Sequence, residues 1–294
     1  MLVSVPATSA NLGPGFDTLG LAINLRNEIR IKHSRFLSVS TKGEGSSNPK
    51  IKRNTMFLNI FNEHYKKLSG GKFNTFRFEF MNKIPISRGL GSSSAVIVAA
   101  LTAAHVAAEV KYNKRKILNL ALKYEPHPDN ITPAVMGGFN VACLHEGRVF
   151  SKKHRLPSYL KAVLVIPNKT ISTNRSRNVL PNSYHKDEVI FSLSHAAYMT
   201  GLFMTESWEQ LKIAAKDKIH QERRMSMMPE LFRVQSIAMD NGALMSTLSG
   251  SGSTFFTLCY EDDTSRIANV LENAFNEFRV MVCDLDNFGV TSKS

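Results

Sequence analysis

The residues best suited to chemistry form a glycine- and serine-rich segment at 89–94, Gly-Leu-Gly-Ser-Ser-Ser, which is followed by an alanine-rich run to residue 104. Glycine lets the backbone approach a ligand closely and adopt a positive φ. Serine can cap a helix, and the first turn of a helix presents free N–H groups and a positive dipole end. Together these features predict a phosphate-binding loop at the start of a buried helix. The segment is not the common P-loop, because Ser92 stands where that motif requires lysine.

A second group of polar side chains is set between prolines, in the order Glu125, Pro126, His127, Pro128, Asp129, Asn130. Proline ends the helix that apolar periodicity predicts over 114–124, and it stiffens the segment. A simple turn could use the Asp and the Asn, but it needs no Glu and His as well. The density of these side chains therefore indicates a functional site held in a rigid turn.

Two further loops carry polar residues with alternative roles. In the loop 8–17, Asn11 and Asp17 flank a Gly-Pro-Gly sequence. For either residue alone, turn formation through side-chain to backbone hydrogen bonds is favoured over ligand binding. The loop 248–254, Leu-Ser-Gly-Ser-Gly-Ser-Thr, repeats the composition of the first loop. It is either a plain connection between helix and strand or, as we favour, a loop that faces a ligand.

The composition predicts a globular protein with one large domain or two ordinary ones. The chain has 294 residues, of which 43% are hydrophobic and 21% charged. No apolar run reaches the roughly 18 residues that span a bilayer, and no signal peptide is expected. The net charge of +13 suits anionic ligands, but the basic residues are scattered, so we expect no nucleic-acid or membrane partner. Cys143, Cys259 and Cys283 lack metal-ligand spacing and are expected to be buried free thiols in a reducing cytoplasm.

Apolar periodicity places further elements around these loops. We expect strands at 2–6, 26–31, 76–80, 161–166, 255–259 and 279–284, and another that ends near 144. Helices are expected at 55–68, 186–204, 206–218 and 264–278, the first of them capped by Asn54. The segment 41–54 has the composition of a surface loop, and a polar break between 145 and 160 indicates a domain boundary.

Several of these segments resemble those of one family. The loop at 85–95 is similar to the phosphate loop of the GHMP small-molecule kinases, and the segment 6–20 resembles that of the homoserine kinase branch. Further similar blocks are His127-Pro-Asp-Asn with Gly137-Gly138, Ser172-Thr173 with Arg177, His220-Gln221 with Arg224, and the loop 248–254. These blocks follow the order of the family over nearly the whole chain.

The resemblance implies an α+β fold with two domains and an active site between them. Residues 1–150 would form an ATP-binding domain like ribosomal protein S5 domain 2, and residues 151–294 a ferredoxin-like domain. The implied activity is ATP-dependent phosphorylation of the L-homoserine hydroxyl to O-phospho-L-homoserine, a step of threonine biosynthesis. The resemblance also implies Mg²⁺, a cytoplasmic location and a homodimer.

Residue roles are carried over by matching motifs. The ATP-binding positions are Asn54, Pro85, Ile86, Ser87, Arg88, Gly89, Leu90, Gly91, Ser92, Ser93, Ser94 and Ala95. Of these, Asn54 falls where the family contacts the adenine base of the nucleotide. The Mg²⁺ ligands would be Ser93 and Glu125, since hard cations prefer oxygen. The substrate-binding positions are Asn11, Asp17, His127, Asp129, Asn130, Arg177, Arg224 and Gly252. Of these, Asp129, Asn130 and Arg177 are also matched as catalytic. The main role implied for Asp129 is to orient the substrate, and a role as general base is secondary.

The pattern of charges fits an amino-acid substrate. Asp would hold its ammonium group, and Arg can hold its carboxylate with two parallel hydrogen bonds. The chain departs from the family at Pro126, where glycine is usual. It also has Arg175 near Arg177 and Arg223 beside Arg224, and motif spacing favours the second Arg of each pair. The alternatives are a sibling GHMP kinase that acts on another small alcohol and a binding protein without catalysis on this scaffold.

Overall fold

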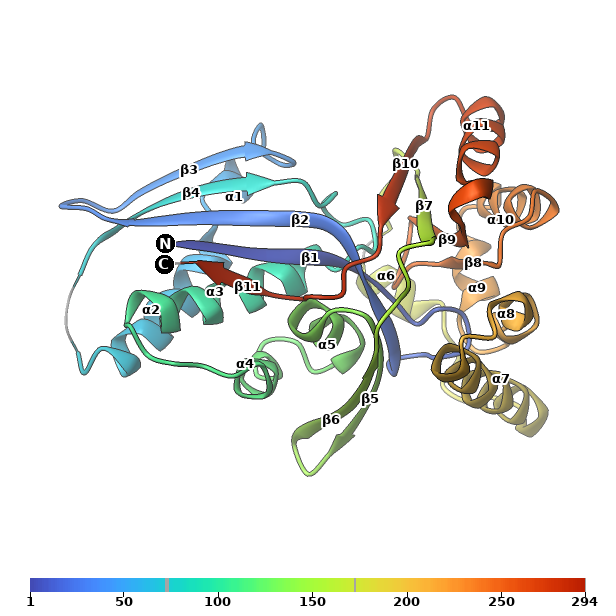
Figure 1. The fold of residues 1–294 in the computed structure, drawn as a ribbon, viewed down its shortest axis with the longest axis horizontal. Coiled ribbons are helices and arrows are strands. Elements are labelled where there is room, and N and C mark those ends of the chain that lie inside the picture. Colours follow the sequence, from blue (N-terminus) through green and yellow to red (C-terminus); the bar gives the residue numbers. More distant parts are fainter. Residues whose placement is uncertain (72–73, 172, 294) are drawn as a thin grey trace.

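The computed structural model describes residues 1–71, 74–171 and 173–293, and it contains two β-sheets (Figure 1). The first sheet has seven strands, with β11-β1-β2-β4-β3 in one path and β5 and β6 joined to it through β2. Its strands are β1 (Leu2–Ala10), β2 (Leu19–His33), β3 (Ser38–Gly43), β4 (Phe76–Asn82), β5 (Phe139–His145), β6 (Arg148–His154) and β11 (Thr291–Lys293). Among the strand pairs that the described residues form in this sheet, β3–β4 alone is parallel. The long strand β2 pairs with β1, β4 and β5, so it joins the two ends of the sheet.

Helices cover one face of the first sheet (Figure 1). They are α2 (Thr55–Leu68), α3 (Ser92–Ala107), α4 (Lys114–Ala121) and α5 (Pro128–Met136), with the short α1 (Pro49–Lys52) near β3. Helix α3 is buried on nearly all sides, as its alanine-rich sequence predicts. Stacked and edge-on rings of Phe57, Phe61 and Phe78 fill the space between α2 and β4. Helix α2 also packs against α3, at whose start the glycine-serine segment lies.

The second sheet has the order β10-β7-β9-β8. Its strands are β7 (Leu160–Ile166), β8 (Met245–Leu248), β9 (Phe255–Tyr260) and β10 (Arg279–Asp284). Both faces of its strand β7 are buried, because Ala162 and Leu164 belong to the main core while Val163 and Val165 join a second core. Helices α10 (Glu230–Asp240) and α11 (Thr264–Ala274) pack on that second core.

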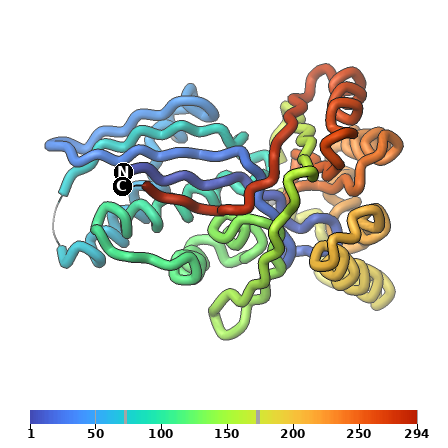
Figure 2. Tube along the Cα trace, viewed as in Figure 1, coloured from blue at the N-terminus to red at the C-terminus, as the bar shows by residue number. Residues whose placement is uncertain are grey.

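The remaining helices connect and flank the second sheet. They are α6 (Thr173–Asn178), α7 (Lys186–Thr205), α8 (Leu211–Ala214) and α9 (Gln221–Met225), with 3-10 turns η1 (Trp208–Gln210) and η2 (Glu261–Asp263). After β10 the chain returns to the first sheet, where β11 pairs with β1 beside the N-terminus (Figure 2). An ion pair between Arg26 and Asp286 secures this return. The predicted boundary at residue 150 falls within β6, and β11 near the C-terminus also belongs to the first sheet. The division of the chain into domains at this position stays a prediction.

Several predicted elements are confirmed, including the helix 55–68 and the strands 161–166 and 279–284. The helix predicted over 206–218 is wrong, since the chain bends at Glu206 with a left-handed φ of 56° and forms only η1 and α8. Asn54 stands at the N-cap position of α2, as predicted, but its side chain makes no capping hydrogen bond and donates to Thr41 Oγ1 at 2.9 Å. The segment 41–54 includes α1 and the end of β3. Cys143 is exposed, whereas Cys259 and Cys283 are buried, and all three thiols are free.

No helix in the described parts of the chain combines the length and the apolar character needed to cross a membrane.

Candidate active site

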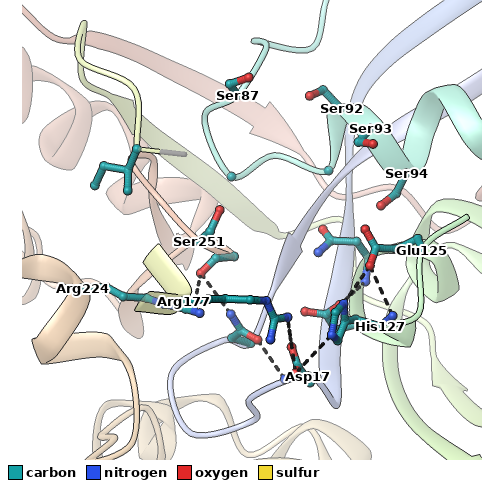
Figure 3. Close-up of a pocket in the computed structure, with 17 residues that line it drawn as sticks. Asp17, Ser87, Ser92, Ser93, Ser94, Glu125, His127, Arg177, Arg224 and Ser251 are labelled. Atoms are coloured by element: carbon teal, nitrogen blue, oxygen red, sulfur yellow. Dashed lines mark hydrogen bonds and ion pairs between the residues drawn. The ribbon is translucent and has the colours of Figure 1, made fainter. Parts of the chain in front are cut away.

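A cavity of about 950 Å³, counting its open mouth, lies where loops from both sheets meet (Figure 3). Its walls come from the loop before α3, the start of α5, the loop after β1, the helices α6 and α9, and the loop after β8. It is lined by Asn11, Asp17, Ser87, Gly89, Gly91, Ser92, Ser93, Ser94, Glu125, His127, Asp129, Asn130, Ile171, Arg177, Arg224, Gly250 and Ser251. Segments far apart in the sequence therefore share one polar cavity.

The glycine-serine loop forms one wall of the cavity. Two of its residues lie so close to neighbouring segments that only glycine fits there. Gly91 has a φ of 65°, and a Cβ there would lie 1.9 Å from Thr8 Oγ1. Gly89 has a φ of 77°, and a Cβ there would lie 2.1 Å from the backbone oxygen of Ser249. The two glycines are thereby pressed between β1 and the loop after β8, and α3 begins within the segment, at Ser92. The free N–H groups of that first turn make a site for an anion.

The cluster 125–130 forms the neighbouring wall, but it is not the turn that the prolines predict. Pro128 occupies the first turn of α5, where its missing N–H costs nothing, so Asp129 and Asn130 sit at the N-terminus of a helix. His127 Nδ1 lies 2.8 Å from Glu125 Oε1, which fixes both side chains at the cavity. Asn130 Oδ1 accepts a hydrogen bond of 2.7 Å from Thr8 Oγ1. The sheet and the helix together thus orient this wall.

Asp129 is the most perturbed acid of the cavity. It is 5% exposed, and its Oδ1 accepts a 2.9 Å hydrogen bond from the N–H of Asn130. Burial raises the pKa of Asp129 to about 7, and repulsion from the carboxylates of Asp17 and Glu125 adds to the rise. An acid that changes its charge near neutral pH in a cavity is typical of functional sites.

The opposite wall carries an ion pair between the two halves of the chain. The loop after β1 turns sharply through left-handed residues, with φ 69° at Asn11 and 55° at Asp17. Asn11 Oδ1 accepts from the N–H of Asp17 at 3.0 Å, and its Nδ2 donates to Gly250 O at 3.0 Å. Asp17 Oδ1 lies 3.2 Å from an Arg177 nitrogen, and Asp17 Oδ2 lies 3.9 Å from His127 Nε2 (Figure 3). A carboxylate and a guanidinium thus face the cavity side by side.

Arg224, in α9, lies beneath this pair and is only 2% exposed. Its nitrogens lie 3.2 Å from Ser176 O, Gly250 O and His220 Nδ1, and its guanidinium lies 5.1 Å from the centre of the Phe16 ring. Burial lowers the pKa of Arg224 to about 10, and the nearby Arg177 adds to this effect. A buried guanidinium that is held mostly by neutral groups is prepared to bind an anion.

His220 holds Arg224 in place. His220 Nε2 lies 2.7 Å from Gly13 O, so this nitrogen carries the proton and Nδ1 accepts from Arg224. Burial lowers the pKa of His220 to about 4, which keeps the ring neutral at neutral pH. Asp217 in turn accepts hydrogen bonds from the backbone N–H groups of His220 and Gln221, at 2.7 Å each. The buried network therefore fixes the first turn of α9 and aims Arg224 at the cavity.

Most of the residues predicted for the site line the cavity, and the structure separates the paired arginines. Arg223 points to Glu188, 2.8 Å away, while Arg224 and Arg177 line the cavity and Arg175 is not among its lining residues. Predicted positions that do not line it are Asn54, Pro85, Ile86, Arg88, Leu90, Ala95 and Gly252. Leu90 is buried and accepts from the N–H of Thr8, and Arg88 donates to Asn168 O at 2.6 Å. Ser172 lies outside the described residues.

Other residues at or behind the cavity were not predicted. Ile171, Gly250 and Ser251 line it, and Phe16 and Ser176 support Arg177 and Arg224 from below. Gly250 and Ser251 belong to the loop 248–254, whose composition had drawn attention to it, so its glycine-serine pattern was the available signal. The support given by Ser176 and Phe16 depends on contacts between distant segments and leaves no local pattern.

The donor set at the cavity fits a hard cation. Among the described residues, no group of three or more His, Cys, Asp and Glu side chains is arranged to hold a metal ion without other ligands. Ser93 and Glu125 nevertheless line the same cavity and offer oxygen. A Mg²⁺ ion usually takes only one or two protein ligands and completes its shell with phosphate oxygens and water.

Comparisons with known proteins identify the family of the chain. Family models for the GHMP kinases N terminal domain and the GHMP kinases C terminal match residues 54–138 and 194–277. The homoserine kinase of Sulfurovum sp. (strain NBC37-1) is 71% identical over 293 residues, with 100% of both chains covered. That of Helicobacter pylori is 51% identical, with 99% of this chain and 98% of the relative covered.

Solved structures show the same fold. The homoserine kinase of Cytophaga hutchinsonii superposes with a TM-score of 0.88 at 24% identity, covering 99% of this chain and 96% of that one. A putative homoserine kinase of Listeria monocytogenes superposes with a TM-score of 0.80 at 25% identity, covering 100% and 99%. The fold is therefore the two-domain, mixed α and β fold of the GHMP kinases, and the chain belongs to the homoserine kinase family of these enzymes.

Proposed function

We propose that the chain transfers the γ-phosphoryl group of ATP to the hydroxyl of L-homoserine within this cavity, which is a step of threonine biosynthesis. The arrangement that carries the proposal is the ion pair of Asp17 with Arg177 beside the buried Arg224, across the cavity from the glycine-serine loop. One end of the cavity thus suits a zwitterion and the other suits a polyphosphate.

At the amino-acid end of the cavity, the ion pair between Asp17 and Arg177 would be replaced by two ion pairs with the substrate. In the structure Asp17 and Arg177 lie 3.2 Å apart and neutralise each other. A substrate with an ammonium and a carboxylate can enter between them, so that Asp17 holds the ammonium with help from Asn11 and His127. Arg177 and Arg224 then share the carboxylate, and the low solvent exposure of Arg224 strengthens this contact. An alcohol without these charges would leave the same groups unpaired, and their desolvation would weaken its binding.

The phosphate end would be formed by backbone groups. The N–H groups of Gly89 through Ser94 would bind phosphate oxygens at the positive end of α3. Bound Mg²⁺ would neutralise charge on the phosphates, and Ser93 and Glu125 would be its protein ligands. The role of Asn54 at the adenine base rests on the resemblance alone, because Asn54 does not line the cavity.

Transfer would depend on position and charge more than on a strong base. Asn130 is held by Thr8 at 2.7 Å and would orient the hydroxyl of the substrate. Asp129 lies beside it, and with a pKa near 7 it can accept a hydrogen bond from that hydroxyl or take its proton. Arg177 would offset the negative charge that moves toward the acceptor.

A coupled assay of ADP release tests the proposal with L-homoserine, mevalonate, shikimate and galactose as acceptors. We expect turnover with homoserine alone, and turnover with another alcohol but not with homoserine would refute the assignment. Arg177→Met and Arg224→Met are expected to raise the KM for homoserine by at least about tenfold with little change in ATP affinity. Arg223→Met is the matched control, because Arg223 is paired with Glu188 outside the cavity.

The metal assignment needs its own test. Glu125→Gln keeps the size of the side chain and the link to His127, but it removes the charge that would attract Mg²⁺. We expect the Mg²⁺ concentration for half-maximal activity to rise by at least about tenfold. An unchanged Mg²⁺ dependence would remove Glu125 from the ligand set and leave the substrate assignment intact.

A further inference from the structure

A second large cavity lies between α4 and the β5–β6 hairpin, next to α5 (Figure 1). It encloses about 1800 Å³, counting its open mouth, and it shares no lining residue with the candidate active site. Two short basic runs of the sequence, 111–116 and 152–155, lie far apart along the chain, and the fold brings them to this one cavity. The site is therefore a product of the fold that neither run indicates alone.

The cavity carries positive charge that no carboxylate balances. Its basic lining residues are Lys114, Arg115, Arg148, Lys152 and Lys153, and no Asp or Glu among the described residues lines it. Within the described parts of the chain, Arg115, Arg148 and Lys152 form no ion pair and no side-chain hydrogen bond. Lys114 and Lys153 donate only to neutral backbone oxygens. All five positive charges thus remain available to a negatively charged ligand.

This positive charge is held together against its own repulsion. Lys114 and Arg115 stand in the first turn of α4, where the helix dipole favours acidic residues. Burial lowers the pKa of Lys114 to about 8, and repulsion from Lys153 adds to the fall. Asp286 opposes this shift, but its carboxylate is buried and paired with Arg26. A bound anion would relieve the repulsion that the chain itself leaves in place.

The deeper part of the cavity is apolar. Leu118 of α4 is buried, and Met136, Val141 and Val149 are partly buried around the same cavity. Phe150 of β6 adds a ring that is 57% exposed. Charges that only protect the unpaired edge of β6 from other strands would need no such apolar lining. An apolar cavity with a few charged groups is instead typical of a site for a small molecule.

We propose that this cavity binds an organic anion with at least two negative charges on an apolar ring system, such as a nucleoside phosphate or an aromatic dicarboxylate. Phosphate and carboxylate groups share the chemistry that Arg and Lys recognise. The ring system would cover the apolar lining around Leu118, and the negative groups would reach Arg148 and Lys152 on the hairpin or Lys114 on α4. Inorganic phosphate would make the charge contacts alone and should bind more weakly. The proposal does not depend on the catalytic assignment, because the two cavities have no residue in common.

Cys143 is a native reporter for the first test, because it lines the cavity with an exposed thiol, whereas the other two thiols are buried. Its rate of reaction is measured with dithiobis(nitrobenzoate), an aromatic dianion, and with the uncharged dithiodipyridine at the same pH. The uncharged reagent reports the reactivity of the thiol itself, so the ratio of the two rates reports attraction of an aromatic anion to the cavity. We expect this ratio to fall at least about tenfold in the double variant Arg148→Gln/Lys152→Gln.

The matched control is Arg35→Gln/Lys66→Gln, which removes the same charge at two exposed residues outside the cavity. The control should change the ratio by less than about twofold, because exposed charges far from the thiol are screened by salt. An unchanged ratio in Arg148→Gln/Lys152→Gln, or an equal fall in the control, would overturn the proposal.

The second test identifies the ligand by its protection of Cys143 against the uncharged reagent. The probes are adenosine monophosphate, naphthalene dicarboxylate, inorganic phosphate and adenosine, each at about 1 mM and at constant ionic strength. We expect at least one of the two organic anions to slow labelling by about fivefold or more, and the stronger of the two shows whether the site prefers phosphate or carboxylate. Adenosine and inorganic phosphate should slow it by less than about twofold, because each lacks one half of the recognised chemistry. No protection by either organic anion, equal protection by inorganic phosphate, or full protection in Arg148→Gln/Lys152→Gln would refute the assignment.

Discussion

Asp129→Asn should make the protein more stable at alkaline pH while removing activity. The carboxyl group is 5% exposed, and burial together with Asp17 and Glu125 raises its pKa to about 7 from a usual value of 3.8. The raised pKa means that the folded protein binds this proton more tightly than the unfolded chain. The stabilisation is complete below the unfolded pKa and is lost as the pH rises through the folded pKa.

The size of the effect follows from the pKa difference. A rise of about three units in the pKa of Asp129 corresponds to roughly 4 kcal/mol of unfolding free energy. The wild type loses this stabilisation above pH 7. At pH 5 most of this stabilisation remains, because the folded carboxyl is still protonated. Asparagine has no charge to bury, and its Oδ1 can still accept from the N–H of Asn130. The free energy of unfolding of Asp129→Asn, relative to that of the wild type, should therefore grow by roughly 3 kcal/mol between pH 5 and pH 8.

Urea unfolding of both proteins from pH 5 to pH 8, without nucleotide, measures this difference directly. The exposed Asp262→Asn is the control and should change stability by less than about 0.5 kcal/mol at any pH. A constant difference across the range would show that Asp129 is ionised throughout, which would refute the electrostatic argument. An Asp129→Asn variant with full turnover would instead refute the placement of Asp129 at the reacting atoms.

Three other substitutions probe the walls of the cavity. Gly91→Ala would place a methyl group 1.9 Å from Thr8 Oγ1 and would force alanine to a φ of 65°. We expect the ATP affinity, measured by calorimetry, to fall at least about tenfold. Arg224→Lys keeps the charge but loses the planar fork, so the KM for homoserine should rise by about tenfold or more in steady-state assays. His220→Gln should raise that KM more than it lowers kcat, because His220 positions Arg224 without lining the cavity; an equal fall in kcat and kcat/KM would contradict this.

Strong local patterns predicted the elements that support the site. The helix 55–68 has aromatic residues at helical spacing and glycines after its end, and α2 has those bounds. The strand β10 was predicted at its observed bounds as well. The predictions failed where tertiary contacts overrule local preference. The segment 206–218 has the composition of a helix, yet the left-handed Glu206 and the burial of Trp208 break it into a 3-10 turn and one short helix.

The site itself was predicted unevenly, and the reason lies in how each residue is held. The glycine-serine loop and the cluster 125–130 carry their chemistry in consecutive residues, so their composition alone drew attention to them. Arg177 and Arg224 have no such pattern, and only the family resemblance separated them from Arg175 and Arg223. In the structure, the choice between Arg223 and Arg224 depends on Glu188 and His220, each of which holds one of the two side chains.

The buried network behind Arg224 explains why this part of the site left so weak a signal in the sequence. Asp217 fixes the backbone at the start of α9, His220 links that turn to Gly13 in the loop after β1, and the same loop carries Asp17. The two charges that would hold an amino acid are therefore positioned together by one set of hydrogen bonds between the halves of the chain. A shift of either half would move Asp17 and Arg224 apart, so recognition of the acceptor depends on how the two sheets pack and not on either loop alone.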